Sequence, residues 1–347
     1  MNKTPHLDSL DMLRAAAAIL VCLHHAFLTW GAQDHQTGFK HTLLHQMAWD
    51  LDLGKIGVMI FFLISGYLIP FTVSTTGLVA QKVFIKKRFF RIYPMFIVAI
   101  IFGLLINALT KDYQFDLIEL ILNIFLVPNL FGQEFISGVF WTLQIEIFFY
   151  LIVASAIPWV TLHKKSYLVS CMLIALALGA EAARAMSTEL DALRELSRVF
   201  GMTSFIFLGS LLRFWRDRAL DRVGTVTLVI FLAHEFIYRT LKLYQVDVVS
   251  AAPKFSSLAG AIAVITFLWM LSAKKGPHFL VFLGRVSYSL YLVHMPVILL
   301  TVNALAATQV GFRGIYLDLL FFSLILIFSI SISAVTYRYV ELRYLRL

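Results

Sequence analysis

Charged residues are scarce in this sequence. Only 14% of the 347 residues are charged and 60% are hydrophobic, whereas a soluble domain carries about 25% charged residues. The mean hydropathy of +0.84 points the same way. This composition excludes a chain made mainly of soluble domains, and it predicts a single membrane-embedded domain over 1–347.

Cysteines are few, and metal-binding patterns and phosphate loops are missing. Cys22 and Cys171 both lie in apolar runs, which favours buried free thiols over a disulfide. No histidine–carboxylate spacing is typical of a metal site and no glycine-rich phosphate loop occurs, so we expect no bound metal. The first apolar run has no small-residue cleavage site, so we expect a membrane span rather than a cleaved signal peptide.

The net charge of +9 does not indicate nucleic-acid binding. The basic residues cluster at the ends of apolar runs, where the positive-inside rule places them. Most of the 29 lysines and arginines fall on one side of the membrane if the N-terminus is cytoplasmic. We therefore expect both termini in the cytoplasm and contact with membrane lipids rather than nucleic acid.

Ten apolar runs are long enough to cross a bilayer as helices. They lie at 9–30, 54–72, 92–110, 139–158, 166–183, 199–213, 223–240, 257–273, 281–304 and 315–337. An eleventh run, 117–131, is short and stops at Pro128, so we expect a re-entrant or interfacial helix. The predicted fold class is an all-α bundle of about ten transmembrane helices.

Arg14 and His25 are eleven residues apart in the first apolar run. Eleven steps of about 100° return almost to the starting direction, so both side chains share one helix face. They lie about 16 Å apart along the axis. Because a charge in a bilayer costs about 3 kcal/mol or more, both residues are candidates for function.

A basic cluster, 86–91, enters the third run. Arg88 and Arg91 are three residues apart and share a helix face. Two guanidinium groups at this spacing suit bidentate binding of phosphate oxygens. The same cluster also fits a positive-inside anchor or a contact with lipid headgroups.

Four further residues inside apolar runs are candidates for function or packing. Glu146 needs an arginine, a histidine or its own proton as partner, and a structural ion pair is an equally good interpretation. His294 taken alone is typical of a hydrogen-bonded core histidine. Ser65 and Gly66 favour close helix packing over a catalytic serine, because no strand–turn–helix elbow surrounds them.

Taken together, five segments resemble the acyltransferase-3 family of integral membrane O-acyltransferases. Each motif is weak alone, but five in the same order are specific. The segments are Leu10–Ala15 followed by His25, Phe61–Ile69, Arg88–Pro94, Trp141–Tyr150 and Ser287–Pro296. Two positions depart from the family pattern: Ile147 stands where many members have a second glutamate, and no proline soon follows Glu341.

The resemblance implies a multi-pass enzyme of the bacterial inner membrane that modifies polysaccharides or similar molecules. Such enzymes move an acyl group, commonly acetyl, from cytoplasmic acetyl-CoA or another acyl-CoA to a hydroxyl. The acceptor is usually a sugar, a glycan or a lipid-linked sugar. Some relatives append a soluble hydrolase-like domain, which we do not expect here.

Acyl transfer needs a base for the acceptor hydroxyl and a held donor. We predict His25 as the general base and Glu146 as the residue that orients His25 or neutralises Arg14. Arg14 would contact the donor or pair with Asp11 at i,i+3. We expect a polar passage that lets the donor thioester reach His25.

The expected ligands are an acyl-CoA donor and a hydroxyl-bearing acceptor. The predicted coenzyme-A-binding residues are Arg88, Arg91, Lys87 and Arg14. The predicted acceptor-binding residues are Trp141, Tyr291 and His294. A membrane transporter or flippase is the alternative, with Arg14, His25 and Glu146 forming an ion or substrate path.

Overall fold

The computed structural model describes residues 8–33, 51–110, 116–159, 191–233, 258–273, 275–307 and 315–344, and positions 169, 172, 175, 176 and 179. Every regular element within these ranges is a helix, which agrees with the all-α prediction. The elements are α1 (Asp8–Gln33), α3 (Leu53–Leu68), η1 (Ile69–Thr72), α4 (Leu78–Thr110), α5 (Leu117–Ile124), η2 (Pro128–Phe131), α6 (Trp141–Ala156), α8 (Asp191–Arg216), α9 (Arg222–Ala233), α11 (Ala259–Leu271), α12 (His278–Arg285), α13 (Ser287–Ala307), α14 (Ile315–Thr336), the π-helical η5 (Tyr337–Glu341) and α15 (Leu342–Tyr344).

Five of these helices are long and apolar enough to cross a membrane. They cover Asp8–Trp30, Leu53–Thr72, Leu78–Leu109, Ser287–Leu305 and Leu319–Tyr344. The apolar helices α6, α9 and α11 are shorter. The chain is therefore a helical membrane protein, and the count of ten spans stays a prediction, because most of 166–183 and all of 234–240 lie outside the described residues.

Two predicted boundaries change. The run 281–304 was expected to be one helix, but the chain breaks at Val286 and forms the separate helices α12 and α13. Helix α4 begins at Leu78 rather than 92, so the basic cluster lies inside the helix. The stretch 117–131 forms the short α5 and η2, each too short to cross a bilayer, and its re-entrant or interfacial position stays a prediction.

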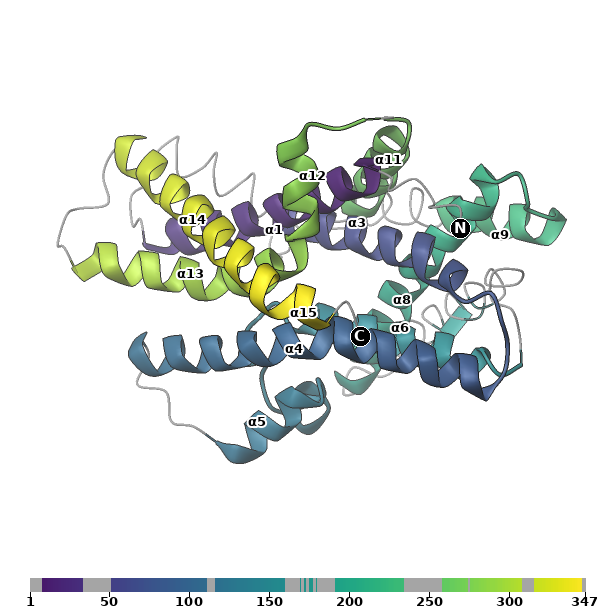
Figure 1. Ribbon diagram of the computed structural model, residues 1–347, viewed down its shortest axis with the longest axis horizontal. Coiled ribbons are helices and arrows are strands. Elements are labelled where there is room, and N and C mark those ends of the chain that lie inside the picture. Colours follow the sequence, from purple (N-terminus) through teal and green to yellow (C-terminus); the bar gives the residue numbers. More distant parts are fainter. Residues whose placement is uncertain are drawn as a thin grey trace.

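Helices α1 and α3 run along the middle of the molecule (Figure 1). Helix α1 contacts α3, α12 and α13, and α3 contacts α8 and α11. Helix α4 lies along one side and contacts α6 and α13, while α13 and α14 pack together toward one end. Residues from α1, α3, α4, α6 and α13 therefore meet in the interior.

Helices α3 and α8 approach until their backbones touch. A Cβ atom at Gly66 would lie 1.6 Å from the Ile206 carbonyl oxygen, and one at Gly209 would lie 2.2 Å from the Leu63 carbonyl oxygen. The Ser210 hydroxyl donates a hydrogen bond to the Gly66 carbonyl at 2.8 Å. The small residues thus serve close helix packing, as the sequence indicated for this segment.

We predict that Gly66→Ala destabilises the protein by about 1–3 kcal/mol, because the added methyl group collides with backbone rather than with a movable side chain. The midpoint of thermal unfolding of purified protein in detergent should fall. Gly201→Ala on α8 is the matched control, since nothing lies within 4 Å of its added Cβ. An equal fall in both variants would contradict this account of the α3–α8 contact.

Candidate active site

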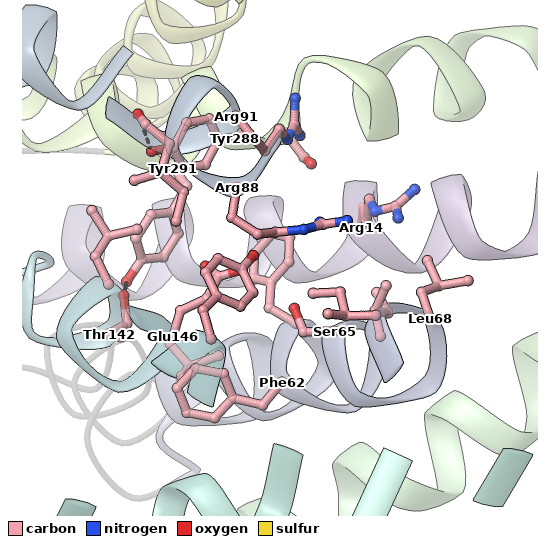
Figure 2. A pocket seen from close by; sticks show the side chains of 18 of the residues that line it. Arg14, Phe62, Ser65, Leu68, Arg88, Arg91, Thr142, Glu146, Tyr288 and Tyr291 are labelled. Carbon is pink, nitrogen blue, oxygen red and sulfur yellow. Dashed lines mark hydrogen bonds between the residues drawn. The ribbon is translucent and has the colours of Figure 1, made fainter. Parts of the chain in front are cut away.

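The first cavity, named here the arginine cavity, has a volume of about 240 Å³. Helices α1, α3, α4, α6 and α13 line it, and its charged residues are Arg14, Arg88, Arg91 and Glu146. Figure 2 shows Tyr291 and Thr142 at one end and Arg14 and Leu68 at the other. The Arg88 side chain extends toward Arg14. The cavity therefore has a cationic end and a tyrosine end.

Arg14 is paired within its own helix. Its Nη1 donates a hydrogen bond to Asp11 Oδ1 at 2.7 Å, one of the two roles predicted for it. Arg285 Nε also approaches Asp11 Oδ2 at 3.8 Å. Gly284 allows this approach, because a Cβ there would lie 1.9 Å from the Asp11 carbonyl oxygen. The buried carboxylate of Asp11 thus interacts with the guanidinium groups of both Arg14 and Arg285.

Arg88 forms no comparable ion pair with the described residues. Its guanidinium carbon lies 5.4 Å from the Phe84 ring centroid and 5.6 Å from that of Tyr150. Its Nε is buried without a hydrogen-bond partner, and no ion pair of Arg88 is found within the described ranges. Buried polar atoms are rarely left unpaired, so this donor fits an oxygen supplied by a ligand. An anionic group such as phosphate suits it best.

Arg91 is held by a residue that the sequence interpretation missed. Its Nη1 lies 2.6 Å from Glu341 Oε2. The backbone N–H of Ser289 donates to Glu341 Oε1 at 3.1 Å, and the Ser289 hydroxyl donates to the same oxygen. Glu341 lies just beyond the apolar run 315–337, so the available signal was an acidic residue directly at the end of a predicted span, where an ionisable residue suggests function.

Glu146 faces the arginine cavity rather than a histidine. Its Oε1 accepts a hydrogen bond of 2.5 Å from the Tyr150 hydroxyl, one turn further along α6. Glu146 and Arg14 both line this cavity, and the two roles predicted for Glu146 stay predictions. The hydrogen bonds of the described residues do not join Glu146 to His25.

The second cavity, named here the histidine cavity, has a volume of about 270 Å³ and includes His25 and Trp141 in its lining. The remaining lining residues are Val21, His24, Asp52, Gly54, Lys55, Val58, Val139, Met202 and Tyr291. The guanidinium carbon of Arg198 lies 5.0 Å from the Trp141 ring centroid. An imidazole and an aromatic ring therefore border one small chamber.

The His25 ring contacts two other imidazole rings, those of His24 and His294. The His25 ring stacks on His294, with centroids 5.2 Å apart and planes at 13°, and meets the edge of His24 at 5.2 Å. His294 is buried behind His25, and its Nδ1 lies 3.3 Å from the Leu290 carbonyl oxygen. His294 thus stacks against the His25 ring, and its buried Nε2 has no hydrogen-bond partner among the described residues.

The expected single passage is divided into two adjoining cavities. Tyr291 and Val58 line both, so the cavities meet at these two side chains. Arg14 lines one cavity and His25 the other, which follows from their shared face on α1. Lys87 is exposed and outside both linings. Within the described ranges, no group of three His, Cys, Asp or Glu residues is placed to hold a metal ion.

The Arg91–Glu341 pair has unequal partners, because 30% of the arginine side chain is exposed and only 1% of the glutamate. We predict that Arg91→Met destabilises the protein by about 3–5 kcal/mol, since it leaves a buried carboxylate without its counter-charge. Glu341→Met should cost less, because Arg91 still reaches solvent. Thermal unfolding in detergent measures both, and the double variant should recover part of the loss. Equal losses in the two single variants would contradict this asymmetry.

Comparison with known proteins identifies the family. The family model described as "Acyltransferase domain" matches residues 7–338. Nodulation protein 10 of Rhizobium leguminosarum bv. viciae is 29% identical over 171 residues, which are 43% of this chain and 44% of that protein. The chain thus spans less than half the length of this relative. No solved structure matches the chain significantly. Because the family model covers nearly the whole length, the chain belongs to the acyltransferase-3 family.

Proposed function

We propose that this chain is an acyltransferase that moves an acyl group, expected to be acetyl, from cytoplasmic acyl-CoA to a hydroxyl of a sugar, glycan or lipid-linked acceptor. The observation that carries the proposal is the pairing of two chambers. An arginine with an unused buried donor lies in one chamber, and His25 borders the next. An acyl-CoA donor has phosphates at one end and a thioester at the other. The phosphates suit the arginine cavity, and the thioester can then approach His25. We expect the enzyme in a bacterial inner membrane.

The donor is proposed to enter with its phosphates against Arg88. A charge-assisted hydrogen bond to the buried Nε would satisfy a donor that has no hydrogen-bond partner among the described residues. Arg14 and Arg91 are already paired with Asp11 and Glu341, so their charges are compensated and Arg88 makes the main proposed phosphate contact. The pantetheine arm would then run toward Tyr291. Arg14 and His25, on one helix face, are about 16 Å apart along the axis, a span such an arm bridges.

The acceptor is proposed to bind in the histidine cavity. Its hydroxyl oxygen attacks the thioester carbonyl carbon while His25 accepts the hydroxyl proton. The C–O bond forms, the C–S bond breaks, and the proton passes from the imidazolium ion to the departing thiolate. His294 keeps the His25 ring in one orientation by stacking. Trp141 and Tyr291 offer aromatic surface to a sugar ring in this chamber.

We predict that Arg88→Ala weakens the binding of coenzyme A by about tenfold or more, because a charged hydrogen bond is worth about 1.5–3 kcal/mol. Equilibrium binding to purified protein in detergent measures the change. Lys82→Ala is the matched control, since Lys82 lies on the same helix and is exposed. Unchanged affinity in Arg88→Ala would remove the assignment of the phosphate site.

We predict that His25→Ala lowers acyl transfer by about a hundredfold or more, the usual contribution of a general base, while the affinity for coenzyme A stays within about twofold. The assay measures release of free coenzyme A thiol from acetyl-CoA in detergent, with a panel of sugars, oligosaccharides and lipid-linked sugars as acceptors. His278→Ala at an exposed position is the control.

Two results would contradict the proposal. Wild-type turnover in His25→Ala would show that another group acts as the base. A wild-type protein without transfer in detergent, but with solute movement across a sealed membrane, would favour the transporter alternative.

A further inference from the structure

Val58 and Tyr291 are the two side chains that border both cavities. Val58 lies on α3 and Tyr291 on α13, and both are buried. In Figure 2, Tyr291 lies at the end of the arginine cavity away from Arg14. Anything that reaches from the arginine cavity to His25 across this junction passes these two side chains.

The Tyr291 ring is held in place. Its hydroxyl lies 2.7 Å from Thr142 Oγ1 and donates to the Val139 carbonyl at 3.1 Å. Phe61 meets the ring edge-on with centroids 5.8 Å apart, and the His294 ring centroid lies 5.9 Å away. A ring with contacts at its tip and on its sides does not move aside readily. Because the Tyr291 ring is fixed, the size of the other junction side chain, Val58, determines how wide the opening between the two cavities is.

The backbone beside Val58 is equally constrained. A Cβ atom at the preceding Gly57 would lie 2.6 Å from the Ala17 carbonyl oxygen, so α3 already touches α1 and has no room to withdraw. Valine has two methyl groups on Cβ, and such a side chain is confined almost to one rotamer in a helix. Val58 thus presents a fixed aliphatic surface at the junction that Tyr291 also borders.

We propose that Val58 is a specificity-determining residue that limits the length of the acyl group, because its two methyl groups occupy the junction that faces Tyr291. This inference rests on the proposed function. Phosphates bound at Arg88 place the thioester at the tyrosine end of the arginine cavity. The carbonyl carbon then lies in the junction, and the acyl chain meets Val58. A pocket that rejects one additional methylene discriminates by about 10- to 200-fold.

The test uses the full chain in detergent and compares the affinities for coenzyme A, acetyl-CoA, butyryl-CoA and hexanoyl-CoA. In the wild type, affinity relative to coenzyme A should fall as the acyl chain lengthens. Val58→Ala should recover at least about tenfold of the affinity for butyryl-CoA, because two methyl groups leave the junction. Val58→Phe should weaken acetyl-CoA by about tenfold or more. Coenzyme A itself should bind all three proteins within about twofold.

Ile60→Val is the matched control, because Ile60 is a buried aliphatic residue on α3 that lines neither cavity. It should leave the ranking of the four ligands unchanged. The result against this inference is a ratio of acyl-CoA affinity to coenzyme A affinity that stays within about twofold of the wild-type ratio in both Val58 variants. If coenzyme A binding still depends on Arg88, that result would overturn this inference alone. A wild-type protein that binds no coenzyme A would overturn the proposed function and this inference together.

Discussion

The pairing of buried charge is the constraint on which the rest of this structure depends. An arginine inside an apolar bundle pays a large desolvation cost unless a carboxylate or a ligand compensates it. Asp11 compensates Arg14 and Glu341 compensates Arg91. Arg88 rests against two aromatic rings, which compensate a cation only in part. Arg88 is thus a cation whose charge the described residues compensate less fully than those of Arg14 and Arg91, and an anionic ligand would complete its surroundings.

The same helices that carry these charges must approach closely enough to enclose them. Glycine makes this possible where α1 crosses α3 at Gly57 and where it crosses α12 at Gly284. In a membrane the lipid is as apolar as the side chains, so backbone contact and polar pairing contribute more to helix association than apolar burial does. The helices around the two cavities are therefore packed too closely to shift. The size of a single side chain such as Val58 then determines how much space the cavities offer.

Local features of the site were predictable from the sequence, because they depend on helix periodicity. The shared face of Arg14 and His25 and the pairing of Arg14 with Asp11 follow from spacing within one helix. The contact between Arg91 and Glu341 joins residues 250 positions apart, and no local pattern encodes it. The division of the expected passage into two chambers likewise depends on how α3 and α13 face each other. Spacing within each helix does not contain that information.

The π-helical turn at Tyr337–Glu341 explains how a carboxylate near the end of the chain reaches the middle of the bundle. A π-turn adds one residue to the helical register, and one residue corresponds to about 100° of rotation around the axis. In an uninterrupted α-helix, position 341 would point in a different direction, and Ser289 at the start of α13 would lose its acceptor. The π-turn therefore rotates the residues that follow it around the helix axis and so sets the direction of the Glu341 side chain. A return of this turn to regular α-helix, with the same sequence, would turn the carboxylate away from both of its partners without removing either one.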